Sequence, residues 1–142
     1  LAWKESYDCG DPLIDSQHQA LFHASNELFQ AILSGHPTSD ISAIISRLLS
    51  DVTQHFHDEE MLLEAIGFPH RQEHAEQHAE LVQKGLQLAE EFSAATLSIG
   101  DVFQFLAFEI VKRHMLEADR QFFPYITEHA LKNHAKQPGP LP

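Results

Sequence analysis

Histidine and acidic side chains recur along this chain at positions that a folded protein would bury. The 142 residues include 11 histidines and 21 acidic residues. Imidazole and carboxylate groups without sulfur suit iron, manganese or zinc better than copper(I) or calcium. Whether these groups can share one site depends on where each points from its own helix.

Residues 54–63, QHFHDEEMLL, place two such groups on the apolar face of an expected helix. At about 100° per residue, Glu59 lies within about 20° of the axis of the apolar stripe, and His55 within about 60°. His57 and Asp58 lie on the far side, toward water. We therefore expect Glu59 and His55 to point into the core. The stripe consists of Ile41, Ile45, Leu48, Val52, Phe56, Leu63 and Ile66.

The other expected helices also direct histidines toward the core. His18 lies in the apolar stripe of the first helix, and His74 and His78 lie in that of the third. In the last helix Asp119 lies within about 40° of the stripe's axis, and His114 lies at its border. Every helix thus contributes at least one inward histidine, and two helices add a carboxylate.

These inward carboxylates need positive partners. A buried ionised carboxylate costs several kcal/mol unless it is paired or bound to a metal, and Arg71 is the one Lys or Arg on these stripes. Seven ligands are too many for one tetrahedral zinc and suit two metals. If both carboxylates and a solvent-derived oxygen bridge the two metals, each metal has three shared ligands. Three histidines then complete an octahedron on one metal, and two histidines leave the other metal with one vacant position. The count predicts a dinuclear centre with one open position.

Four helical segments must position these side chains, and no alternating strand pattern occurs. The apolar periodicity predicts them at residues 16–34, 40–65, 70–94 and 98–136. Pro124 should kink or break the last one. Short connections between long helices predict an all-α, antiparallel up-down-up-down four-helix bundle with an irregular N-terminal arm at residues 1–12. We expect one domain over residues 1–136 and a Pro-rich tail or linker over 137–142.

Composition argues against several classes of partner. The net charge is −12 and no basic cluster exceeds Lys112-Arg113, which argues against nucleic acid and anionic membranes. No apolar run approaches the roughly 20 residues of a membrane span, and no signal peptide opens the chain. Cys9 is the single cysteine, so no internal disulfide or thiolate cluster can form. We expect a cytoplasmic protein without membrane insertion.

Taken in order, these residues resemble the hemerythrins, specifically the bacterial hemerythrin-like domains, over nearly the whole chain. The matching stretches are Ile14-Asp-Ser-Gln-His18, His55-Phe-His-Asp-Glu59, Phe68-Pro69 followed by His74-x-x-x-His78, and His114-x-x-x-x-Asp119. The resemblance implies two iron ions joined by an oxo or hydroxo bridge, with O2 as the ligand. It implies that the saturated iron is held by His74, His78 and His114, the open iron by His18 and His55, and both by the bridging Glu59 and Asp119.

One position departs from the family's pattern. The family commonly has Trp four residues before the last histidine ligand, where this chain has Ile110. The smaller side chain should leave the open iron more accessible. We expect a dry lining for the O2 pocket, which protects bound dioxygen from protonation, formed by Phe108, Ile110, Val111 and Met115.

Three functions are compatible with this resemblance. The first is reversible O2 binding for carriage, storage or presentation. The second is O2 or redox sensing by a domain excised from a longer signalling protein with an output domain; the start at Leu1 and the Pro-rich tail favour it. The third is a di-iron oxidase or peroxidase. The chain has no Glu-x-x-His motif of the kind that ferritin-like di-iron enzymes carry, so we expect a binding protein rather than an enzyme.

Overall fold

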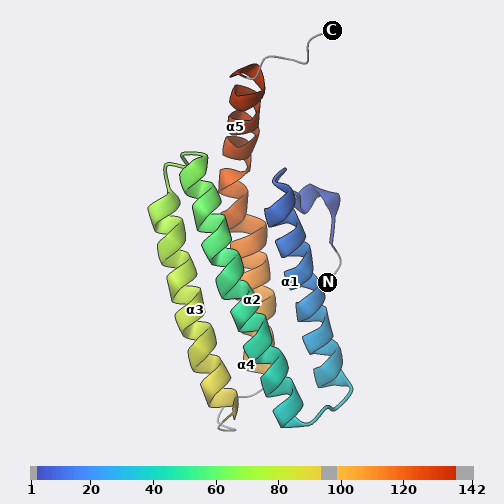
Figure 1. Ribbon diagram of the computed structural model, residues 1–142. Helices are drawn as coiled ribbons and strands as arrows, with labels where there is room; N and C mark the ends of the chain where they lie inside the picture. The colour runs from blue at the N-terminus through green and yellow to red at the C-terminus, as the bar shows by residue number, and fades with distance from the viewer. Residues whose placement is uncertain (1–2, 94–98, 137–142) are drawn as a thin grey trace.

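The fold is an antiparallel bundle of long helices. The computed structural model describes residues 3–93 and 99–136, and no strand occurs among them. Helices α1 (Pro12–Leu33), α2 (Thr38–Ala65) and α3 (Arg71–Ser93) run alternately down and up beside a fourth, composite helix (Figure 1). The predicted all-α up-down-up-down bundle is confirmed.

Helix α1 begins four residues before the predicted start at residue 16. The Asp11 side chain caps it by accepting a hydrogen bond from the Ile14 backbone N–H at 3.1 Å, and Pro12 occupies the first helical position. Proline suits that position because its missing N–H would have no helical partner there. The preceding arm contains one 3-10 turn, η1 (Glu5–Tyr7).

The fourth helix changes type three times along its length. It consists of α4 (Ile99–Gln104), the π-helix η2 (Phe105–Ala118), the 3-10 turn η3 (Asp119–Phe122) and α5 (Phe123–Lys136). Pro124 lies at the second position of α5, so the predicted break falls at the change from 3-10 to α geometry. The apolar periodicity did not predict the π-helix, a rare geometry that is frequently found at functional sites.

Two apolar clusters fill the bundle, one toward each end of the set of inward polar residues. The larger cluster comprises Leu21, Phe22, Leu28, Ile41, Ile45, Leu48, Leu49, Val52, Phe56, Phe92, Val102, Phe105, Ile110 and Met115. The smaller one comprises Cys9, Ile14, Leu63, Phe68, Phe122 and Ile126. We call the inward polar residues between the clusters the polar layer. It is formed by His18, His55, Glu59, His74, His78, His114 and Asp119.

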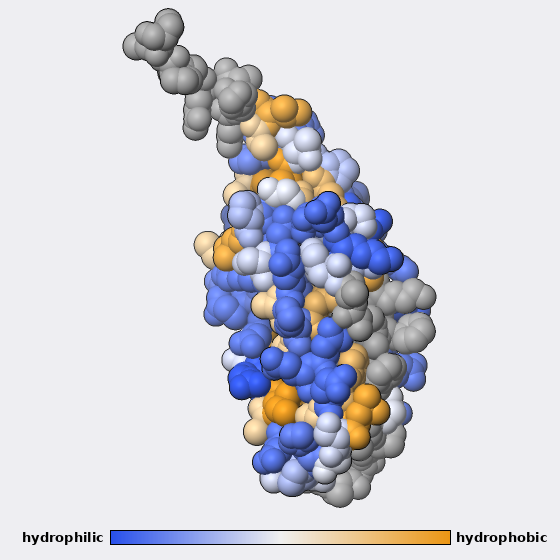
Figure 2. Space-filling model, turned by 90° about the vertical axis from the view of Figure 1, so that its right-hand side faces the viewer, coloured by the Kyte–Doolittle hydropathy of each residue, from blue (hydrophilic) through white to orange (hydrophobic). Residues whose placement is uncertain are grey.

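The face of the molecule shown in Figure 2 is largely hydrophilic, with scattered apolar side chains. This agrees with the net charge of −12. Among the described residues, no helix combines the length and apolar character needed to span a membrane.

Candidate metal centre

The structure brings all seven residues of the polar layer together. None is more than 3% exposed, and both carboxylates are fully buried. The layer contains two groups whose ligand atoms lie within 4.8 Å of one another. We call them the five-residue group, formed by Glu59, His74, His78, His114 and Asp119, and the four-residue group, formed by His18, His55, Glu59 and Asp119.

Glu59 offers a different oxygen to each group. Its Oε1 lies 2.9 Å from His74 Nε2 and 3.1 Å from His78 Nε2. Its Oε2 lies 3.2 Å from His18 Nε2 and 3.1 Å from His55 Nε2. A carboxylate in this position can bridge two metal ions.

Asp119 has the same arrangement. Its Oδ1 lies 2.8 Å from His74 Nε2 and 3.0 Å from His114 Nε2, both in the five-residue group. Its Oδ2 lies 3.2 Å from His18 Nε2, in the four-residue group. The two carboxylates therefore connect the same two positions.

Several of these atoms have lone pairs that nothing in the described part of the chain satisfies. His55 Nε2 and both Asp119 carboxylate oxygens are buried without an aligned hydrogen-bond partner, despite their short contacts. His78 Nε2 and His114 Nε2 face each other at 2.7 Å. Since buried polar atoms are nearly always hydrogen-bonded, these unmet lone pairs mark a donor set for cations. Nitrogen and oxygen donors without sulfur fit iron, manganese or zinc.

The charges of the polar layer also indicate a site for cations. Burial lowers the pKa of His18, but the nearby Asp119 and Glu59 carboxylates raise it to about 10. Burial also lowers the pKa of His74, and the same carboxylates raise it to about 9. Burial raises the pKa of Glu59, but four surrounding histidines hold it well below its usual value. The carboxylates remain anionic and require positive charge, from imidazolium protons or from metal cations.

The π-helix explains how residues five positions apart can both face the layer. In an α-helix, His114 and Asp119 would point about 140° apart. Here the Asp119 backbone N–H donates to the His114 carbonyl, a bond across five residues. Since that bond closes one π-helical turn, the two side chains lie one above the other. Sequence periodicity had placed His114 only at the border of the apolar stripe.

Hydrogen bonds on the outer side of two imidazoles were missed by the sequence analysis. His55 Nδ1 lies 2.7 Å from Gln17 Oε1, and His78 Nδ1 lies 3.3 Å from Glu60 Oε2. Asp58, predicted to face water, is half-buried because it accepts a hydrogen bond from Gln17 at 2.7 Å. The sequence offered one indication of these contacts. Gln17 directly precedes His18, and Glu60 directly follows Glu59, both residues of the polar layer.

The N-terminal arm covers the bundle near the four-residue group. The Trp3 ring centroid lies 6.5 Å from that of His18, and Trp3 packs edge-on against Phe22 at 5.1 Å. Arg120 lies over the Tyr7 ring at 5.9 Å and donates a hydrogen bond to the Ser6 carbonyl at 3.4 Å. Nothing in the spacing of the arm's residues indicated this position.

The structure describes the side chains of two of the four residues expected to line the O2 pocket. Ile110 and Met115 are buried in the larger apolar cluster. The side chains of Phe108 and Val111 lie outside the described residues. The lining role of all four remains a prediction.

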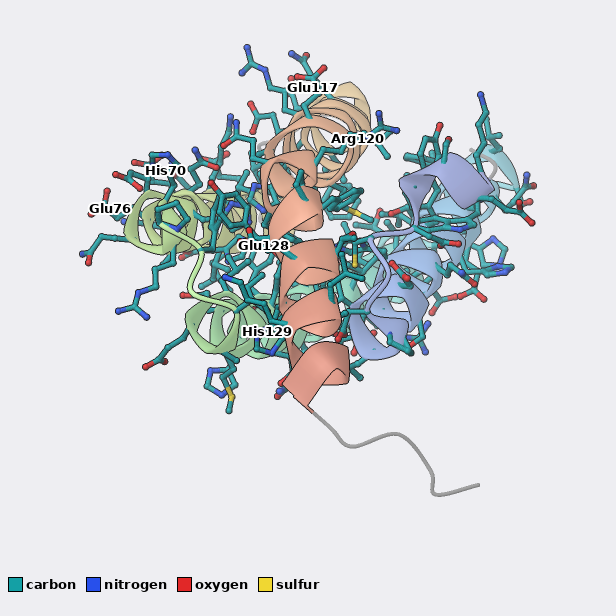
Figure 3. All side chains as sticks on the ribbon, turned by 90° about the horizontal axis from the view of Figure 1, so that it is seen from above. His70, Glu76, Glu117, Arg120, Glu128 and His129 are labelled. Carbon is teal, nitrogen blue, oxygen red and sulfur yellow. The ribbon has the colours of Figure 1, made fainter. Side chains whose placement is uncertain are left out.

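His57 faces solvent as predicted, whereas Asp58 is half-buried. His23 and His57 are exposed, and Arg71 is exposed rather than inward, so it cannot neutralise the layer's carboxylates. Figure 3 shows His70, Glu76 and Glu117 at the outer rim of the bundle. The His70 side chain is 65% exposed, which separates it from the buried histidines of the layer.

Comparisons with known proteins agree with this geometry. The family model described as Hemerythrin HHE cation binding domain matches residues 9–126, a span that contains the whole polar layer. A bacteriohemerythrin of Clostridium acetobutylicum is 26% identical over 130 residues, covering 86% of this chain and 98% of that protein. A bacteriohemerythrin of Pseudomonas aeruginosa is 25% identical over 119 residues, covering 84% and 76%.

Proposed function

Because this chain belongs to the hemerythrin family, we propose that its polar layer holds two iron ions and that the protein binds O2 reversibly. The observation that carries the proposal is the double use of Glu59 and Asp119. Each carboxylate presents one oxygen to the five-residue group and the other to the four-residue group. This arrangement suits two adjacent metal ions, because a single ion in one group would leave the second oxygen of each carboxylate without a metal.

The unequal histidine count of the two groups supports a single open position. His74, His78 and His114 would hold one iron, and His18 and His55 the other, with both carboxylates common to the two. Two iron ions with an oxo or hydroxo bridge would supply the electrons for reversible O2 binding. With one bridging oxygen, the five-residue group reaches six ligands and the four-residue group reaches five.

The surrounding residues suit ligand binding rather than turnover. Phe56 stacks on the His78 ring with centroids 3.8 Å apart, and Ile110 and Met115 belong to the same buried apolar cluster. We expect these side chains to exclude water from the centre, and the stacked Phe56 ring holds the His78 imidazole in place. Histidine supplies five of the seven side chains, which favours binding over oxygen activation. We therefore assign O2 carriage, storage or presentation, in the cytoplasm, without an enzymatic step.

Metal analysis and optical spectroscopy test this proposal together. Protein purified with iron supplied should contain two iron atoms per chain. The spectrum of the reduced protein should change when air is admitted and return when oxygen is removed. One iron per chain, or two irons with no reversible spectral change, would contradict the assignment.

A further inference from the structure

A chain of hydrogen bonds leads from His55 outward across two helices. His55 Nδ1 lies 2.7 Å from Gln17 Oε1, and Gln17 Nε2 lies 2.7 Å from Asp58 Oδ2. The other Asp58 oxygen accepts a hydrogen bond from Gln54 Nε2 at 3.1 Å. Gln17 is on α1, whereas the other three residues are on α2.

The chemistry of these groups determines the direction of every bond. The Asp58 carboxylate can only accept, so the Gln17 amide must turn its NH2 group toward it. That orientation leaves the Gln17 carbonyl oxygen facing His55, so His55 Nδ1 must donate. A neutral imidazole with its proton on Nδ1 has a bare lone pair on Nε2. That nitrogen is the buried atom without an aligned partner that faces Glu59.

We propose that Gln17, oriented by Asp58, is a positioning residue that fixes His55 in the tautomer able to bind a metal through Nε2. It thereby sets the metal affinity of the four-residue group. The inference rests on the proposed function in taking that group as a metal site. Hydrogen bonds to the outer nitrogen of a histidine ligand commonly change metal affinity by about 10–100-fold.

The five-residue group does not depend on the Gln17–Asp58 hydrogen bond. His78 Nδ1 faces Glu60 Oε2 directly at 3.3 Å. A carboxylate accepts whichever way it turns, so Glu60 needs no further residue to orient it. An amide has a donor end and an acceptor end, and Gln17 therefore requires Asp58. A change at Gln17 should weaken one metal position and spare the other.

Anaerobic titration of the iron-free full chain with Fe2+ tests this, followed by iron analysis and by Trp3 fluorescence. Trp3 is the only tryptophan, and its ring lies 6.5 Å from His18 in the four-residue group, so quenching reports occupancy there. Gln17→Leu should raise the second dissociation constant by about 10–100-fold and leave the first at the parent value. The matched control is Gln54→Leu, which removes a contact to the far oxygen of Asp58 and should titrate like the parent.

A pair of compensating substitutions tests whether Gln17 acts through its hydrogen bonds or only through packing. Gln17→Glu combined with Asp58→Asn again places an acceptor opposite His55 and a donor opposite the new carboxylate. This double variant should bind the second iron at least as tightly as the parent. Circular dichroism checks that each variant keeps the helical content of the parent, and if Gln17→Leu fails to fold, the double variant decides alone.

The outcomes distinguish this inference from the proposed function. A parent protein that takes up fewer than two irons contradicts the function itself. A parent that binds two irons, with Gln17→Leu titrating identically, overturns the role of Gln17. Loss of second-iron affinity in a folded double variant overturns it as well.

Discussion

The larger apolar cluster and the polar layer occupy the same bundle and are both almost completely buried, but different forces stabilise them. In the cluster, side chains such as Leu48 and Phe56 contribute through the apolar area removed from water. In the layer, Glu59 is 0% exposed and contacts four histidines, so each group depends on the charge and orientation of the others. A gap in the cluster costs packing, whereas a gap in the layer leaves several polar atoms without partners.

The comparison is tested most strongly by Glu59→Ala. This change removes the two Glu59 oxygens that four imidazoles contact. We expect iron to be lost from both positions and the free energy of unfolding to fall by about 3–5 kcal/mol. Iron analysis and urea denaturation measure the two effects. His57→Ala, on the exposed face of the same helix, is the control and should keep both irons. Iron loss in the control would refute the assignment of faces.

Leu48→Ala examines the apolar side of the comparison. Leu48 is 3% exposed and lies on the same helix as Glu59, so its truncation creates a cavity remote from the layer. We expect the free energy of unfolding to fall by about 2–5 kcal/mol, with two irons retained. If folded Leu48→Ala protein loses iron, the two regions are not energetically separate.

The pH dependence of the free energy of unfolding of the iron-free protein also distinguishes the polar layer from the apolar cluster. The pKa values of His18 and His74, about 10 and about 9, lie above the ordinary value of 6.5. Their protonation therefore stabilises the fold fully below pH 6.5, and the contribution is lost as the pH rises toward the raised values. We expect the free energy of unfolding to fall by about 1–4 kcal/mol between pH 6 and pH 9.

The measurement is urea denaturation across that interval. Leu48→Ala should lower stability equally at every pH, since it leaves the layer's charges unchanged. A flat profile in the iron-free parent would show that the carboxylates do not hold protons on these histidines.

The smallest expected effect comes from Ile110→Trp, at the boundary between the two regions. Ile110 is 3% exposed, so a larger ring should cost about 1–3 kcal/mol by overpacking. It should also cover the layer more fully, and the oxygenated spectrum should then decay more slowly in stopped-flow measurements with iron content unchanged. Equal or faster decay in a variant with two irons would place control of access elsewhere, for example at Met115.

Helical periodicity predicted the buried faces of the helices, because their apolar stripes extend past the polar layer, although Arg71 was wrongly assigned to a stripe. It placed Glu59 and His55 inward and His57 outward relative to the apolar stripe between Ile41 and Ile66, and the structure agrees. Periodicity also placed Asp119 near the axis of the last stripe, and the family resemblance, confirmed by the family match over residues 9–126, added its expected role as a bridging ligand.

What escaped prediction depends on contacts between helices or on the hydrogen-bond register within one. The π-helix differs from an α-helix by a one-residue shift in the backbone hydrogen bonds, which leaves little mark on composition. Asp58 looked solvent-facing because its partner, Gln17, lies 41 residues away on another helix. The position of Trp3 near His18 likewise depends on how the arm returns across α1.

The shared carboxylates have a topological consequence for a chain with one cysteine and therefore no internal disulfide. A loaded centre would join His18 on α1 to Asp119 at the start of η3, with links to α2 and α3 between them. Metal ligation would then serve as a reversible cross-link that closes a long loop between residues 18 and 119, and long loops are the closures that most restrict an unfolded ensemble. Unfolding of the loaded protein would have to break this cross-link, so its midpoint should rise with free iron concentration.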